Sequence, residues 1–280
     1  MPIHDQGYRR YAGTRAAVGR GWAVITRNGV RTFVSKRAFI GLLLFAWFPF
    51  VVRAVQIYVA SNFVQAQSIL GVKAETFREF LDQQSLFVFF VTIYVGAGLI
   101  ANDRRANALQ VYLSKPLTRA EYVAGKLAIL FLFLTAVTWA PAISLLIVQI
   151  MFAGSFTFVR DNMFLLPAIT LFSLLQVLLA SATMMALSSM SKSSRFVGIM
   201  YAGLMFFTAA LSAALRSITG RSAFAWLSPT ATLEQLGDII FRLRPRYDLP
   251  AAGAVLVVIV LIALSAVILE RRVRGVEVVQ

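Results

Sequence analysis

The chain lacks cysteine altogether, and its single histidine is His4, close to the N-terminus. Without cysteine there is no disulfide framework and no thiolate chemistry. Protein zinc sites are built mainly from cysteine and histidine, so we expect no metal centre in this chain. Charge is scarce as well, because 14% of the residues are charged whereas soluble domains average about a quarter.

Apolar residues are abundant instead: they make up 59% of the 280 residues, and the mean hydropathy is +0.76. Several apolar runs reach the ~20 residues that a helix needs to cross a bilayer. A surface that faces lipid accounts for the shortage of charge. The sequence therefore predicts an all-α polytopic membrane protein.

Six apolar segments are predicted as transmembrane helices, at residues 39–60, 85–101, 127–152, 163–190, 196–215 and 250–269. Pro49 should kink the first of them, and Pro141 lies near the middle of the third. The charged stretch 61–84 is expected to be a polar connector. We treat residues 39–280 as one six-helix transmembrane domain.

Residues 1–38 form a basic leader ahead of that domain. At 100° per residue, Trp22, Ile25 and Phe33 fall on one side of a helix, opposite to arginines 20, 27 and 31. This pattern is typical of an amphipathic helix that lies in the membrane surface. The alternative is an ordinary basic flank that fixes the orientation of the first span.

The longest connector, residues 216–249, is only partly polar. Ser228 and Pro229 are typical of a helix N-cap followed by a first-position proline. We therefore expect one or two short re-entrant or external helices before the sixth span.

The net charge of +15 is not spread as a nucleic-acid-binding stripe, so we expect no nucleic-acid partner. Residues 1–38 hold eight Lys and Arg against Asp5, and other basic clusters fall in alternate loops. Only the 216–249 connector departs from this alternation, with five cations against three acids. By the positive-inside rule both termini are cytoplasmic, and membrane lipids are the expected surroundings.

No catalytic apparatus is visible in the expected spans. They contain no Asp or Glu in their interior, and the chain has no phosphate-binding loop of the Walker type. The chain is therefore not expected to be an enzyme by itself or to bind a cofactor, and energy for uphill transport would come from a partner. Polar side chains available for a substrate path are Arg53, Gln56, Gln149 and Gln176, although Arg53 could instead extend to the membrane surface.

Residues 101–126 form a polar, basic interruption between the second and third spans. Pro116 should end the incoming helix, and Thr118 with Glu121 fits a capping box that starts the next one. Apolar side chains such as Leu109, Leu113 and Leu117 favour docking of a partner on this elbow. The alternative is a solvated loop.

The elbow resembles the permease signature of ABC-2-type transporters. The similarity runs through Leu109, Leu113, Ser114, Lys115, Pro116, Leu117, Thr118, Arg119, Glu121, Tyr122, Gly125 and Lys126. The six-span plan, the surface helix and the long fifth-to-sixth connector also fit that family. The unusually basic residues 1–20 depart from it.

The resemblance implies the membrane subunit of an ABC exporter in a bacterial or archaeal cytoplasmic membrane. Two permease protomers would pair with two ABC ATPase subunits, which bind the ATP and Mg. The elbow residues from Leu109 to Glu121 would couple the permease to the ATPase. The alternatives are a membrane scaffold or assembly factor that is recruited through the same elbow, and a passive or ion-coupled carrier.

Overall fold

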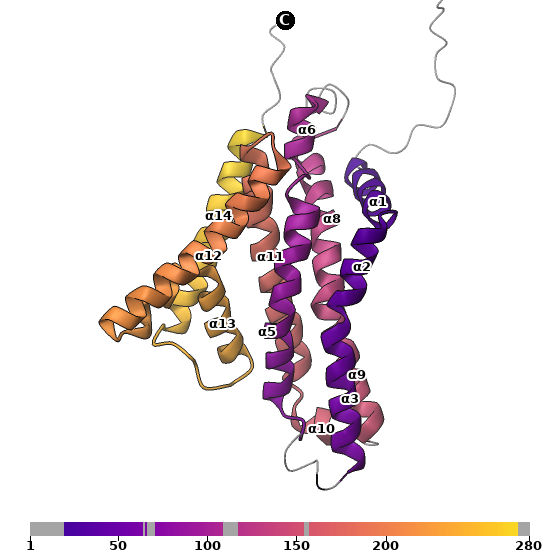
Figure 1. Cartoon of the computed structure of the whole chain (residues 1–280), viewed down its shortest axis with the longest axis vertical. Helices are drawn as coiled ribbons and strands as arrows, with labels where there is room; N and C mark the ends of the chain where they lie inside the picture. The colour runs from indigo at the N-terminus through magenta and orange to yellow at the C-terminus, as the bar shows by residue number, and fades with distance from the viewer. Residues whose placement is uncertain (1–19, 64, 66–70, 109–116, 154–156, 274–280) are drawn as a thin grey trace, which may run out of the picture.

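The computed structural model describes residues 20–63, 65, 71–108, 117–153 and 157–273. This part of the chain is helical and contains no β-strand. It has six helices that are long and apolar enough to cross a membrane: Arg37–Asn62, Ala74–Arg105, Arg119–Phe152, Leu165–Met190, Ser194–Thr219 and Ala251–Arg272. The chain is a multi-pass membrane protein with the predicted number of spans, and most of the helices run along one long axis (Figure 1).

The first and third spans are each interrupted once. The first consists of α2 (Arg37–Ala46) and α3 (Phe48–Asn62), and Pro49 lies in the first turn of α3. The third consists of α8 (Arg119–Val137) and α9 (Trp139–Ala153), with the break at Thr138. Proline lacks a backbone N–H and clashes with the preceding turn, which explains the predicted kink at Pro49.

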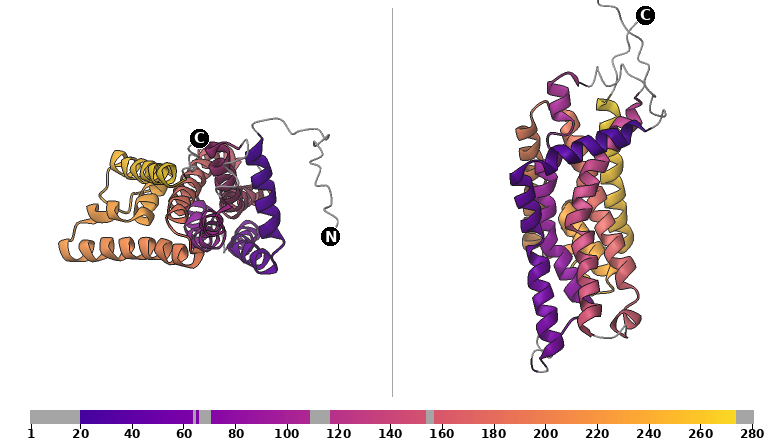
Figure 2. Two further views of the ribbon diagram at one scale, coloured as in Figure 1. Left: turned by 90° about the horizontal axis from the view of Figure 1, so that it is seen from above. Right: turned by 90° about the vertical axis from the view of Figure 1, so that its right-hand side faces the viewer.

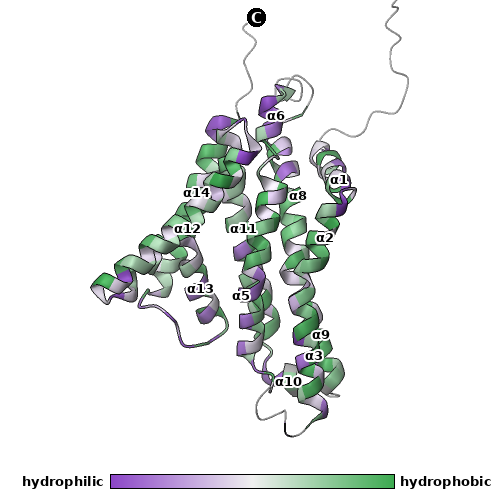
Figure 3. Cartoon of the chain, in the orientation of Figure 1, coloured by the Kyte–Doolittle hydropathy of each residue, from purple (hydrophilic) through white to green (hydrophobic). Residues whose placement is uncertain are grey.

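The second span is longer than the sequence predicted, and the expected polar connector 61–84 is wrong in its second half. Helix α5 runs from Ala74 to Val91, followed by a π-helical turn, η1 (Thr92–Gly96), and the short α6 (Ala101–Arg105). Three charged residues of α5 have ion-pair partners: Arg78 and Asp82 pair with each other and with the region of α13, and Glu79 pairs with Arg53 of α3, as described below. Hydrophilic residues are accordingly visible along the lower part of α5 (Figure 3).

Helix α1 (Gly21–Val34) lies across the bundle and packs against α8 (Figure 2). A Cβ atom at Gly125 of α8 would lie 2.9 Å from the backbone oxygen of Trp22, so only glycine permits this approach. The Thr26 hydroxyl also donates to the Gly125 carbonyl at 3.1 Å. The predicted helix is confirmed, and Ile25 and Phe33 of its apolar face contact the helical core. Its place in the membrane surface stays a prediction.

The C-terminal part of the chain opens away from the other helices (Figure 1). It consists of α12 (Ser194–Thr219), the 3-10 helix η2 (Ser222–Leu227), α13 (Pro229–Ile240) and α14 (Ala251–Arg272). The Ser228 hydroxyl caps α13 by accepting from the Ala231 N–H at 3.3 Å, and Pro229 is the first helical residue, as predicted. Helix α13 packs against α5, α11 (Leu165–Met190), α12 and α14.

Two main apolar cores stabilise the described part of the chain, and a third, small cluster packs α13 against α14. The larger lies at the end that carries α1 and α6 and joins α5, α8, α11 and α12. The smaller lies at the opposite end, near α10 (Thr157–Asp161), and joins α3, α5, α9 and α11. Helices α5 and α11 contribute to both cores and therefore connect the two ends of the molecule.

Candidate functional site

The base of the predicted coupling elbow is a capped helix start. The backbone N–H of Thr118 donates to Glu121 Oε2 at 3.0 Å, and the Glu121 N–H donates to Thr118 Oγ1 at 3.2 Å. This is the predicted capping box. Of the proposed coupling residues, Leu117, Thr118, Arg119 and Glu121 are described, whereas Leu109, Leu113, Ser114, Lys115 and Pro116 lie outside the described residues.

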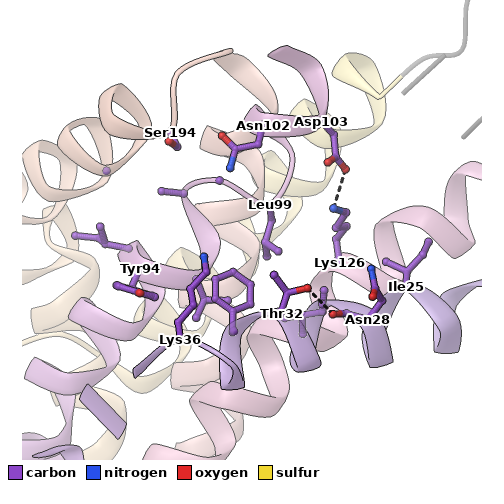
Figure 4. A pocket seen from close by; sticks show the side chains of 18 of the residues that line it. Ile25, Asn28, Thr32, Lys36, Tyr94, Leu99, Asn102, Asp103, Lys126 and Ser194 are labelled. Carbon is purple, nitrogen blue, oxygen red and sulfur yellow. Dashed lines mark hydrogen bonds and ion pairs between the residues drawn. The ribbon is translucent and has the colours of Figure 1, made fainter. Parts of the chain in front are cut away.

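Side chains tie the two arms of the elbow together where they leave the bundle. Asp103 of α6 pairs with Lys126 Nζ of α8 at 2.7 Å and accepts a hydrogen bond from the Tyr122 hydroxyl at 2.8 Å (Figure 4). Tyr122 is fully buried. A buried tyrosine with a satisfied hydroxyl fixes the spacing between α6 and α8 at this point.

The incoming arm is also tied to the end of α11. The Ser188 hydroxyl oxygen accepts from the N–H groups of Ile100 and Ala101, both at 3.1 Å, and donates to the Ala97 carbonyl at 3.0 Å. Arg104 donates to the Ser189 carbonyl. These contacts satisfy backbone groups that the irregular turn between η1 and α6 leaves without helical partners.

Leu117 and Arg119 differ in their surroundings. Leu117 is half-buried, packs against the larger core and faces Gly21 of α1, where an added Cβ would lie 2.3 Å from the leucine side chain. Arg119 is exposed in the first turn of α8. Among the described elbow residues, Arg119 is therefore available to a partner, while Leu117 holds the elbow against α1.

A second site, which the sequence analysis missed, is centred on Arg78 of α5. This arginine is fully buried. Its guanidinium pairs with Asp82 one turn along the helix, lies 3.3 Å from Asp238 Oδ1 of α13, and donates to the Glu234 carbonyl at 3.0 Å. Its Cζ lies 4.6 Å from the centre of the Phe172 ring. Two carboxylates, a backbone carbonyl and an aromatic ring thus compensate the burial of this charge, although its Nε has no hydrogen-bond partner.

Arg246, in the segment after α13, completes the cluster. Its Nη2 lies 2.7 Å from Asp82 and its Nε lies 3.1 Å from Asp238. Two arginines and two aspartates thus alternate, and we call them the α5–α13 ion cluster. Burial raises the pKa of Asp238, and the charges of Arg78 and Arg246 oppose that rise.

Gly237 makes room for the cluster. A Cβ atom at this position would lie 2.4–2.6 Å from the guanidinium atoms of Arg78. Because Gly237 of α13 has no side chain, the buried Arg78 of α5 can reach the Glu234 carbonyl and Asp238.

The ion cluster bears on two of the arguments from the sequence. Glu79 and Asp82 lie within the second candidate helix Ala74–Arg105, ahead of the predicted span 85–101. Both carboxylates are paired, Glu79 with Arg53 at 3.0 Å and Asp82 with two arginines. The excess of cations in the 216–249 connector is also partly neutralised within the protein, because Arg246 pairs with Asp82 and Asp238.

The four residues proposed for a substrate path do not share one cavity. Gln176 borders a cavity of about 430 Å³ between α5, α11, α12 and α13. Its Nε2 donates to Ser85 Oγ at 2.9 Å, while its buried Oε1 has no hydrogen-bond partner. Arg53 instead donates a hydrogen bond to Gln56 Oε1 at 2.9 Å and forms an ion pair with Glu79. Gln149 is buried on α9, and its Oε1 has no hydrogen-bond partner.

The walls of the Gln176 cavity are mostly apolar and aromatic, and its polar end is formed by Asp82, Glu234 and Arg246 of the cluster region. Its volume and composition are those of a site for a small, mostly apolar molecule with a polar group. Within the described residues, no group of three or more His, Asp and Glu could hold a metal ion.

Comparison with known proteins assigns no family: no protein-family model matches the chain, and no protein of curated function matches it either.

Proposed function

We propose that the chain is the membrane subunit of an ABC exporter, and that a separate ATPase acts on residues 101–126. The observation that carries this proposal is the construction of the elbow base. Asp103, Tyr122 and Lys126 join the two arms, so a force on the elbow moves α6 and α8 as one body. The sequence resemblance of the same segment to ABC-2-type permeases supplies the kind of partner.

Charge supports a cytoplasmic location for the elbow. The described acids at the elbow end of the bundle are Asp103, Glu121 and Glu270, against many arginines and lysines in α1, α6, α12 and the end of α14. The opposite end is closer to balance, because the ion cluster pairs two arginines with two aspartates and Arg53 pairs with Glu79. By the positive-inside rule, this asymmetry supports a cytoplasmic location for the elbow and both termini.

In the proposed mechanism, ATP and Mg bind only to the partner ATPases, and two copies of this chain form the membrane part. Closure of the ATPases would bias a two-state arrangement of α6 and α8. Helix α5 leads through the π-helical turn η1 into α6, and π-helical turns within helices frequently lie at functional sites. Movement of the elbow would in this way alter the packing around the Gln176 cavity.

The test is co-purification with an ATPase that is encoded by the host. We expect Arg119→Glu to abolish co-purification, because it reverses an exposed charge on the elbow. The substitution should not harm folding, since a carboxylate is favourable in the first turn of a helix. Lys192→Glu is the matched control, because Lys192 is exposed in the turn between α11 and α12 at the same end.

Equal retention of the ATPase by both variants would contradict the elbow assignment. Leu117→Glu is less informative than Arg119→Glu, because Leu117 packs against α1 and the core. Transport by the reconstituted complex separates an exporter from a scaffold. A scaffold would bind the ATPase through Arg119 without ATP-dependent movement of any substrate.

A further inference from the structure

A second cavity lies beside the elbow base. It has a volume of about 960 Å³ and is bordered by α1, the turn from η1 to α6, α8 and the start of α12 (Figure 4). It lies at the end of the bundle where basic residues collect. None of the residues proposed for a substrate path borders it.

The charged lining of this cavity is unbalanced. Among the described residues that line it, Asp103 is the only acid, and that carboxylate is already paired with Lys126 at 2.7 Å and bonded to the Tyr122 hydroxyl. Lys36 and Arg195 also line the cavity, and neither forms an ion pair within the described part of the chain. They come from different elements, the junction of α1 with α2 and the first turn of α12. Within the described residues the cavity thus offers a ligand two cations that have no carboxylate partner, and Lys36 lies 5.1 Å from the centre of the Phe33 ring.

The remaining lining is of two kinds. Asn28, Thr32 and Asn102 supply polar groups to the cavity (Figure 4). On α12, Ile199 and Ala202 follow Arg195 at spacings of four and seven residues, so they lie on the same face of the helix. Ile199 is 69% exposed and Tyr94 of η1 is 40% exposed, which leaves an apolar track below the cations.

We propose that this cavity binds the headgroup of an anionic phospholipid from the membrane face on which α1 lies. The phosphate would lie between Lys36 and Arg195, and an acyl chain would follow Ile199 and Tyr94. Basic pockets between transmembrane helices suit anionic headgroups, and the apolar track favours a lipid over a soluble anion. The proposal is independent of the partner ATPase, because binding can be measured on this chain alone.

The test is a binding titration of the purified full chain in detergent with phosphatidylglycerol and with phosphatidylcholine, followed by native mass spectrometry. We expect phosphatidylglycerol to bind about tenfold tighter, since each cation near an anionic lipid contributes to affinity. The double variant Lys36→Gln with Arg195→Gln should lose this preference. The control, Arg27→Gln with Arg31→Gln, should keep it, because these exposed α1 arginines do not border the cavity.

Three outcomes would overturn the proposal: equal affinity for the two lipids, an unchanged preference in the Lys36 and Arg195 variant, or an equal loss in the control. The charge-preserving pair Lys36→Arg with Arg195→Lys should retain the preference, which separates lost charge from misfolding. Glycerol 3-phosphate serves as the competitor. If it displaces phosphatidylglycerol at millimolar concentration, the occupant is a soluble phosphate and the lipid assignment is wrong.

Discussion

Replacement of Arg78 should destabilise the protein more than replacement of any exposed cation. The variant Arg78→Met removes the guanidinium and leaves Asp238, which is 1% exposed, with Arg246 alone. Breaking a buried ion pair by removing one partner costs about 3–5 kcal/mol. At about 2–4 °C per kcal/mol for chains of about 150–250 residues, the unfolding midpoint should fall by roughly 6–20 °C.

The matched control is Arg53→Met, which breaks a pair on the neighbouring helix. The Arg53 side chain is 13% exposed, but that of its partner Glu79 is 58% exposed, so water solvates the carboxylate left behind and the cost is about 1 kcal/mol. Thermal unfolding of both variants in one detergent, followed by size-exclusion chromatography, measures the difference. Equal midpoints for the two variants would refute the structural role of the ion cluster.

The fall in the unfolding midpoint of Arg78→Met should depend on pH. Burial already raises the pKa of Asp238, and removal of Arg78 takes away a charge that lowers it, so this pKa should rise further. A carboxyl group whose pKa is raised on folding loses stabilisation as the pH rises from about 4 through its folded-state value. The midpoint deficit should therefore be larger at pH 8 than at pH 5. When Asp238→Asn is added to Arg78→Met, this pH dependence should disappear and the unfolding midpoint should rise part of the way back to that of the unsubstituted protein.

Three further changes test the fold. Gly125→Leu should displace α1 from α8, because its Cβ would meet the backbone of Trp22. A disulfide between one cysteine introduced into α1 and one introduced into α8 should then no longer form. The chain has no native cysteine, so no other disulfide can interfere with this measurement. Arg160→Cys and Lys192→Cys should be labelled by an impermeant thiol reagent from opposite sides of the membrane. Ser228→Ala should lower the unfolding midpoint by the equivalent of about 1 kcal/mol, because it removes the cap of α13.

The features predicted correctly from the sequence are those that depend on a few neighbouring residues. The capping box at Thr118 joins groups only three positions apart, and the cap at Ser228 has the same span. Pro49 acts on its own turn of helix. Such features arise from backbone hydrogen bonds that must be satisfied locally, so their residue types are informative without any knowledge of the fold.

The ion cluster was missed because its parts are distant in the sequence. Arg78 is stable inside the protein only because Gly237 leaves space and Asp238 supplies charge, and both lie on α13. One local signal was available, since Phe77, Phe80 and Leu81 extend the helical apolar period of the second span backwards. The many charged residues in the same stretch favoured the prediction of a polar connector. The stretch is helical nevertheless, because ion pairs with distant residues compensate those charges.

Helix α5 connects the elbow to the ion cluster. At one end, α5 leads through η1 and α6 into contacts with Ser188 and Tyr122, and at the other end Arg78 holds it to α13. The Gln176 cavity is bordered by α5 and α13 between these two attachments. A helix that is fixed at both ends transmits displacement of one end to whatever packs along it, unless it bends at η1. Under the proposed function, force applied at the elbow would therefore reach α13 and the cavity through α5, and the strength of the Arg78 attachment would decide how much of that motion the cavity receives.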